Sequence, residues 1–279
     1  MSYFASSSSN HGTNRVLERT LNEILAVIKP SEEDVRARTR IIDDLKAVVN
    51  QSAAEYSSLQ GVMKSHLLHF VAAIDRRFRD MVLLVKVQEW AKSEDINNAR
   101  DGTLNSYALC WLVIYHFQTC KPPILPPLKE LHTGGTVAGS LIYSVYGDDL
   151  INQMNANVER FKRERLINTS SLSELFVSFF QKFSAVEFTN YNYFCTYTET
   201  WEETSDTYLA FLDDVPLLHI RDPFARNENV ARSVEDTTKI FKAFQKTYAM
   251  LLSASGRDRF SLISNFVRPE IGAQMITRG

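Results

Sequence analysis

The chain has 279 residues, 44% of them hydrophobic, which is enough to bury a core in one large domain or two small ones. Its formal net charge of −2 excludes a polycation that binds nucleic acid over its whole surface, so any RNA contact would be a local patch. The three cysteines form no CxxC pair, and no apolar run approaches the roughly 20 residues that span a bilayer. We therefore expect an intracellular protein, in the cytoplasm or nucleus, with reduced thiols and no membrane contact.

The first part of the chain has the pattern of a tail followed by helices. Residues 1–13 are rich in serine and are expected to form a disordered tail without the basic and apolar regions of a signal peptide. From Asn14 the apolar residues recur at helical spacing up to Pro30, and a second helix with an acidic first turn follows. We assign residues 14–51 to an N-terminal helical segment and residues 52–279 to a helical central domain.

The most apolar stretch lies in the middle of the chain. After a helical pattern over residues 63–85 comes segment 101–128, DGTLNSYALCWLVIYHFQTCKPPILPPL. A glycine and two proline pairs punctuate its ends, so a buried helix of about four turns fits between them. Its polar start, Asn105-Ser106-Tyr107, would lie at the helix N-terminus, where free N–H groups and the helix dipole favour an anion such as phosphate. An ordinary core helix with a polar cap is the alternative.

The C-terminal half alternates helices with a β-rich passage. A glycine-rich region after the prolines looks like a variable insertion. The pattern Ser171-x-x-Glu174 is a capping box before a run of leucines and phenylalanines. Residues 186–219, rich in Tyr, Thr and Phe, are expected to form one or two short strands, and Ser233-x-x-Asp236 to cap the last long helix. The predicted fold class is therefore mainly α with minor β.

Several segments in a fixed order carry a resemblance to a known family. They are the stretch 101–128, VLLVK (82–86), EWAK (89–92), SELFVSFF (173–180) and RDPFARNENVARSV (221–234). Together they resemble the non-canonical poly(A) polymerase and RNA terminal uridylyltransferase family, most of all its plant members that tail small RNAs. The resemblance implies a helical central domain, with a PAP-associated segment at about residues 170–235, packed against a nucleotidyltransferase palm. UTP would lie in the cleft between the two.

Four residues match the family positions that bind the base and the phosphates. Ser106 and Tyr107 match a pair whose hydroxyl contacts the triphosphate and whose ring stacks on the base. Lys86 and Lys92 match two lysines that neutralise phosphate charge, but the family usually spaces them four apart, on one helical face. Here they are six apart, because Val87-Gln88 looks like an insertion. In a regular helix this rotates Lys92 by about 200°, unless a bulge restores the register.

Other matches concern the ribose and a loop signature. Ser65, with Lys64 beside it, matches a polar pair that contacts the ribose hydroxyls, although Lys64 replaces the more usual Asn. Glu228 stands where some members have a uracil-selecting His, so base preference does not carry over. The DPF…N..R signature, which we interpret as mainly structural, falls on Asp222, Pro223, Phe224, Asn229 and Arg232.

The metal site of the family is what the sequence lacks. Transfer of UMP from UTP to an RNA 3′ end uses two Mg²⁺ or Mn²⁺ ions, held by aspartates at i and i+2 on one strand and a third on its neighbour. Between Val49 and Gly61, where the palm should begin, the chain has only NQSAAEYSSLQ, and no Asp-x-Asp occurs anywhere in the sequence. On the order of 100 residues of palm are missing. The Gly-Ser at 139–140 with the adjacent aspartates at 148–149 is a poor substitute. We predict no catalytic residue and no bound metal in this chain.

Other interpretations stay open beside an inactive uridylyltransferase relative. One is a non-catalytic RNA- or protein-binding module; another is a truncated isoform that folds poorly. Three basic runs are solvated faces or a local RNA-binding stripe, namely Arg36/Arg38/Arg40, Arg76/Arg77/Arg79 and Arg160/Lys162/Arg163/Arg165. The pairs His66/His69 and His116/Cys120 have helical spacing, but half-buried or core positions are favoured over metal binding. The partners implied are UTP and RNA 3′ ends, bound weakly or not at all, and protein partners of the complete enzyme.

Overall fold

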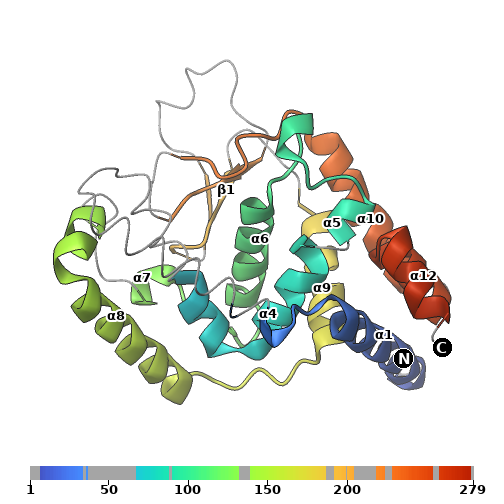
Figure 1. Ribbon diagram of the computed structural model, residues 1–279, viewed down its shortest axis with the longest axis horizontal. Helices are drawn as coiled ribbons and strands as arrows, with labels where there is room; N and C mark the ends of the chain where they lie inside the picture. Colours follow the sequence, from blue (N-terminus) through green and yellow to red (C-terminus); the bar gives the residue numbers. More distant parts are fainter. Residues whose placement is uncertain are drawn as a thin grey trace, which may run out of the picture.

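The structure is a computed structural model that describes residues 7–33, 36, 67–87, 90–131, 139–186, 192–198, 200–203, 218–223, 228–253 and 258–277. Most of these residues are helical, with α6 at the centre and a small sheet beside it (Figure 1). None of the described helices is both long and apolar enough to cross a membrane. The predicted fold class, mainly α with minor β, is confirmed.

The helices fall into two groups by length. The longer ones are α1 (Ser7–Ile28), α4 (Arg76–Val82), α6 (Ser106–Gln118), α8 (Gly139–Glu164), α9 (Leu172–Ser184), α10 (Thr237–Leu252), α11 (Arg259–Phe266) and α12 (Pro269–Thr277). The shorter ones are the π-helix η1 (Leu83–Val87), α5 (Trp90–Ser93), the 3₁₀-helix η2 (Ala99–Asp101) and α7 (Leu128–Leu131). Residues 67–74 are also helical. The glycine-rich region expected to be an insertion thus contributes the start of α8.

Helix α1 ends before Pro30, as predicted, but it begins at Ser7, inside the segment for which we expected a disordered tail. Once a helix is nucleated, each further residue adds a hydrogen bond, so the serines extend it. Its buried apolar stripe packs on α9 and α11. The Glu23 carboxylate at mid-helix is 2.7 Å from Arg259 Nε of α11. The first and last parts of the described chain therefore pack together (Figure 1).

The expected boundary near residue 51 and most of the second helix lie outside the described residues.

Of the two N-terminal caps that we predicted, for α9 and α10, one is confirmed. At the start of α9 the Ser171 hydroxyl accepts the Glu174 N–H at 3.2 Å, and Glu174 accepts the Ser171 N–H at 2.8 Å, so the capping box is confirmed. The cap predicted for α10 is wrong. Asp236 itself caps this helix by accepting a first-turn N–H at 2.7 Å. Ser233 instead donates its hydroxyl to the Thr103 carbonyl at 2.9 Å.

Aromatic side chains join α5, α9 and α10. The Trp90 ring lies 4.7 Å from the Phe180 ring and 4.8 Å from the Phe244 ring, measured between centroids. Its indole N–H donates to the Thr247 hydroxyl at 2.8 Å, so the buried polar atom is satisfied. These contacts fix the short helix α5 to the core, and with it the exposed Lys92 two residues further on.

One small sheet accounts for the strands of the described chain. The strand order is β2 (Thr200–Glu203), β1 (Asn192–Cys195), β3 (His219–Ile220), with β1 antiparallel to β2 and parallel to β3. The Phe194 ring of β1 packs on Tyr115 of α6 at 5.0 Å and on Phe183 of α9 at 5.5 Å. The β-rich passage therefore forms strands, as predicted, and they cover one side of the central helix.

Asp75 fixes the start of α4. Its carboxylate accepts the Arg77 backbone N–H at 3.0 Å and two guanidinium N–H groups of Arg77 at 2.9 and 2.7 Å. Arg165, which follows α8, lies 3.6 Å away. Burial alone would raise the pKa of Asp75, but the hydrogen bonds and charge of Arg77, with the charge of Arg165, hold it below its ordinary value. The ionised carboxylate therefore connects α4 to the end of α8.

The lowered pKa of Asp75 predicts a stability that depends on pH. A carboxyl with a folded pKa below its unfolded value, here near 3.8, stabilises the protein above that value, and the stabilisation is lost as pH falls through the folded pKa. We expect Asp75→Asn to lower the melting temperature by several degrees at pH 7, and the difference to shrink as pH falls below about 3.8. Circular dichroism melts of both proteins at several pH values measure this. Asp149→Asn, at an exposed position, is the control. A difference that stays constant with pH would contradict the assignment.

Candidate functional site

Asn105 fixes the start of α6. Its side-chain oxygen accepts the Ala108 N–H at 2.7 Å and so caps the helix. Its side-chain amide donates to the Val230 carbonyl at 2.7 Å. The predicted buried helix with a polar start is confirmed, and the cap is also a tertiary contact. The loop that carries part of the DPF signature is thereby joined to the helix that carries Ser106 and Tyr107.

Ser106 is oriented by an asparagine that the sequence did not single out. The hydroxyl of Ser106 and the side-chain amide of Asn97 exchange hydrogen bonds at 3.2 Å, and both residues are half-buried. The turn before Asn97 is closed by the Ile96 N–H, which donates to the Ala91 carbonyl at 2.8 Å. Sequence spacing offers no signal for this pair, because the turn between α5 and α6 brings the two residues together. The Ser106 hydroxyl therefore has a defined position at the helix N-terminus.

Tyr107 lies beside the signature loop. Its ring meets Trp111 edge to face at 5.2 Å, and the residue is half-buried. Burial raises the pKa of Tyr107 far above its ordinary value, and the carboxylates of Asp222 and Glu228 raise it further. The phenol therefore stays protonated and can act as a hydrogen-bond donor. The structure brings Tyr107 and Asp222 together, although they are 115 positions apart in the sequence.

The two lysines lie on different elements. Lys86 is in the π-helix Leu83–Val87, a wide turn of the kind that accommodates extra residues in a helix. Lys92 is exposed on α5. A regular helix through both lysines, which would rotate Lys92 away, does not form within the described ranges. The side chain of Lys86 lies outside the described part of the structure, as do Lys64, Ser65 and Phe224.

Asn229 holds the signature loop in place. Its side-chain oxygen accepts the N–H groups of Ile220 and Ala231, each at 2.9 Å, and its amide donates to the Leu218 carbonyl at 3.0 Å. The residue is buried. Arg232, by contrast, is exposed and pairs with Glu228 at 3.5 Å. Asn229 thus supplies three hydrogen bonds that replace regular strand pairing at this bend.

The described residues do not fit a two-metal site. Within the described ranges no three His, Cys, Asp or Glu side chains come close enough to hold a metal ion. The aspartates at 148–149 lie on helix α8, not on a strand, and Asp149 is exposed.

His116 is buried and contacts the Leu175 carbonyl at 3.1 Å, and burial lowers the pKa of His116 to about 3. The expected core position of His116 is confirmed.

Comparison with known proteins supports one family. The chain is 42% identical to Protein HESO1 of Arabidopsis thaliana over 207 residues, which cover 72% of this chain and 40% of that protein. It is 31% identical to the poly(A) RNA polymerase GLD2 of Homo sapiens over 132 residues, or 47% of this chain and 25% of that protein. The chain thus spans less than half the length of these relatives. No protein-family model matches it.

Solved structures show the same fold. A cytoplasmic RNA terminal U-transferase superposes with a TM-score of 0.67 at 19% identity, over 86% of this chain and 95% of that one. The Cid1 poly(U) polymerase superposes with a TM-score of 0.55 at 25% identity, over 69% of this chain and 58% of that one. The helical fold is therefore that of RNA nucleotidyltransferases. The chain belongs to the non-canonical poly(A) polymerase and RNA terminal uridylyltransferase family, and it is similar to plant HESO1.

The contacts of Asn229 predict a large effect on stability. We expect Asn229→Ala to lower the free energy of unfolding by about 3 kcal/mol, because three hydrogen bonds are lost and buried backbone groups are left unpaired. Urea denaturation measures the change. Arg232→Ala, in the same signature but exposed, is the control and should change stability by less than about 1 kcal/mol. Equal effects of the two substitutions would show that Asn229 is not the structural residue of the loop.

Proposed function

We propose that this chain retains the nucleotide-binding face of an RNA terminal uridylyltransferase but does not transfer UMP by itself. The observation that carries the first half is the start of α6. There Asn97 hydrogen-bonds to Ser106, Asn105 joins the helix to the signature loop, and the Tyr107 ring packs on Trp111. The second half rests on the sequence, in which no Asp-x-Asp pair occurs. Family membership supplies UTP as the nucleotide and RNA 3′ ends as the acceptor.

The chemistry of the proposed nucleotide site follows from the residue types. The Ser106 hydroxyl and the free N–H groups at the start of a 13-residue helix suit a triphosphate oxygen. The Tyr107 ring offers a surface on which a base can stack. Lys86 and Lys92 would add positive charge for the remaining phosphates. Lys64 and Ser65 would contact the ribose hydroxyls, as the family resemblance implies. We propose weak binding, because the opposite wall of the family's cleft is the palm.

Catalysis needs a second set of residues. Mg²⁺ or Mn²⁺ would neutralise the phosphates and activate the RNA hydroxyl, which requires closely spaced carboxylates. The described part of this chain offers no such group, and the sequence lacks the family's spacing. We therefore assign no catalytic residue and no metal to this chain. We also propose that it acts inside the cell. We interpret it as a shortened form of a full enzyme, which transcript reads joining the codons of Asn50 and Ser52 would test.

A tailing assay tests the absence of activity. The purified chain is incubated with labelled UTP, an RNA oligomer and either Mg²⁺ or Mn²⁺. We expect no extension of the RNA above the buffer control, because the metal-binding carboxylates are missing. A complete uridylyltransferase assayed in parallel shows that the conditions permit tailing. Robust tailing by this chain would overturn the proposal of inactivity.

Nucleotide binding tests the site independently of activity. We expect Tyr107→Ala to weaken UTP binding by about tenfold, since base stacking contributes roughly 1–3 kcal/mol. Tyr107→Phe, which keeps the ring, should retain most of the affinity. Isothermal titration calorimetry measures both variants, with thermal melts to show that each is folded. An unchanged affinity in Tyr107→Ala, or equal losses in the two variants, would argue against stacking on this ring.

A further inference from the structure

The segment between α8 and α9 exposes two neighbouring apolar side chains. It runs as an extended stretch along the outside of the molecule (Figure 1). Leu166 is 75% exposed and Ile167 is 80% exposed, the highest values among the large hydrophobic residues that the structure describes. Single exposed apolar residues are common, but two neighbours this exposed mark a surface on which another molecule can be buried.

Both ends of this apolar pair are fixed to the core. The Arg165 guanidinium, just before the pair, donates to the Ile124 carbonyl at 2.7 Å and to the Ile74 carbonyl at 3.3 Å. Asn168, just after the pair, is buried and donates its side-chain amide to the Pro122 carbonyl at 2.7 Å. The two side chains between these anchors are therefore held outwards.

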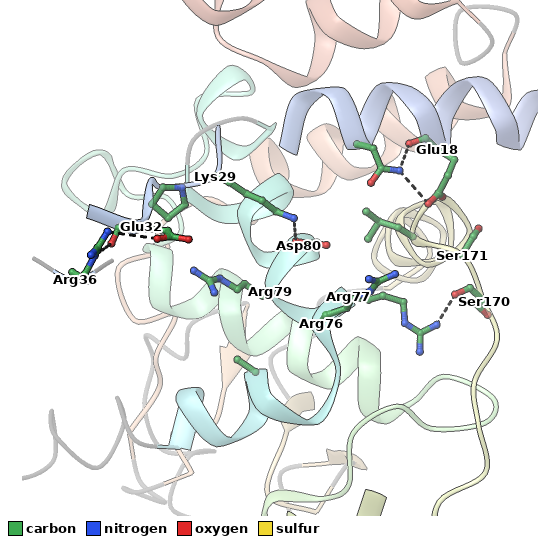
Figure 2. A pocket seen from close by; sticks show the side chains of 14 residues that line it. Glu18, Lys29, Glu32, Arg36, Arg76, Arg77, Arg79, Asp80, Ser170 and Ser171 are labelled. Atoms are coloured by element: carbon green, nitrogen blue, oxygen red, sulfur yellow. Dashed lines mark hydrogen bonds and ion pairs between the residues drawn. The ribbon is translucent and has the colours of Figure 1, made fainter. Parts of the chain in front are cut away.

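A further anchor lies two residues beyond Asn168. The Arg77 guanidinium of α4 donates to the Ser170 carbonyl at 2.5 Å (Figure 2). The Ser170 N–H in turn donates to the Asn168 side-chain oxygen at 3.0 Å. Residues 165–170 are thus bound to α4 and to the loop after α6. A surface that is fixed before binding loses little conformational entropy when a partner docks on it.

The loop after α6 adds a third apolar side chain. The carbonyls of Pro122 and Ile124 accept the hydrogen bonds of the two anchors, and Pro123 between them is exposed. Pro123, Leu166 and Ile167 therefore lie between the same two contact points, and we call them the apolar edge. This edge follows the C-terminal end of α6, whereas the proposed nucleotide site lies at the start of that helix.

The backbone of the segment is also open to pairing. Within the described ranges the N–H and C=O groups of Leu166 and Ile167 form no hydrogen bond, and water can reach both residues. Burial in lipid would leave these polar groups unpaired, which is unfavourable. An extended peptide would instead pair with them and cover the apolar side chains in one step. The apolar edge therefore favours a protein partner over a membrane.

The charges around the apolar edge favour an acidic partner. Lys121 precedes the two prolines, and Arg160 and Arg163 lie in the last two turns of α8. All three are exposed, and within the described ranges none of them forms an ion pair. The carboxylates on the same turns are those of Glu159, which has an ion-pair partner, and Glu164, which is exposed. Positive charge therefore prevails at this rim, and carboxylates of a partner would be attracted to it.

We infer that the apolar edge docks an extended segment of a protein partner that carries both aliphatic side chains and carboxylates. The backbone of that segment would pair with residues 166 and 167. Its aliphatic side chains would cover the edge, and its carboxylates would lie beside the basic rim. The inference goes beyond the proposed nucleotide site and does not depend on it, because the two surfaces lie at opposite ends of α6.

Hydrogen–deuterium exchange of the full chain with a defined peptide tests the inference. The probe is a peptide of about ten residues in which valine alternates with glutamate, so that a strand of it has one apolar and one acidic face. We expect the probe to slow exchange in fragments that contain residues 166 and 167, because paired N–H groups are protected. Peptides with lysine in place of glutamate, or with proline in place of every second valine, should give no protection.

Substitutions identify the side chains that bind. The double variant Leu166→Ser and Ile167→Ser should bind the labelled valine–glutamate peptide at least about tenfold more weakly in fluorescence anisotropy, because both anchors lose apolar area. Both positions are exposed, so its thermal melt should match that of the unchanged chain. The matched control is Leu252→Ser with Phe260→Ser, at exposed apolar positions on α10 and α11, and it should keep the affinity.

The charged rim and the membrane alternative are tested with the same chain. Lys121→Gln with Arg163→Gln should weaken binding of the glutamate peptide and reduce its dependence on salt. Equal peptide affinity in the serine double variant and the unchanged chain, or no protection at residues 166 and 167, would overturn the docking edge. So would binding to phosphatidylserine vesicles in the absence of peptide binding. The serine double variant should keep its UTP affinity, so a failure of the nucleotide site leaves this test unaffected.

Discussion

The side chain of Asn105 links the two halves of the proposed nucleotide site. Its oxygen caps α6 and its amide holds the Val230 carbonyl, so helix and signature loop have one relative position. Trp90 anchors α5 against α9 and α10, and the turn that follows α5 brings Asn97 to Ser106. The geometry of the site thus depends on polar contacts made possible by an aromatic core.

Periodicity and caps predicted the parts of the fold that are local. The apolar run of α6 and the box of Ser171 and Glu174 at α9 were readable because neighbours in sequence make those contacts. The roles of Arg76, Arg77 and Arg79 were not, because the Ser170 carbonyl, 93 positions further along the chain, accepts a hydrogen bond from Arg77. In sequence, Arg77 looks like its neighbours Arg76 and Arg79. Contacts across the fold decide between them.

The arrangement also separates recognition from chemistry. The residues that we propose for the base and the triphosphate lie on the helical domain, whereas the family places the metal-binding carboxylates on the palm. The proposed nucleotide binding at the start of α6 therefore does not require those carboxylates. Under our proposal, membership of an enzyme family and the lack of transfer by this chain are therefore compatible.

The ion pair between Glu23 and Arg259 has a consequence for biosynthesis. Helix α1 is made before α9 and α11, but its apolar stripe packs on these two helices, which leave the ribosome more than 140 residues later. The contacts that bury α1 therefore form late, and they close a long loop. Until then helix α1 exposes its leucines and isoleucines to solvent. The chain should depend on chaperones during translation more than its helical content alone would suggest.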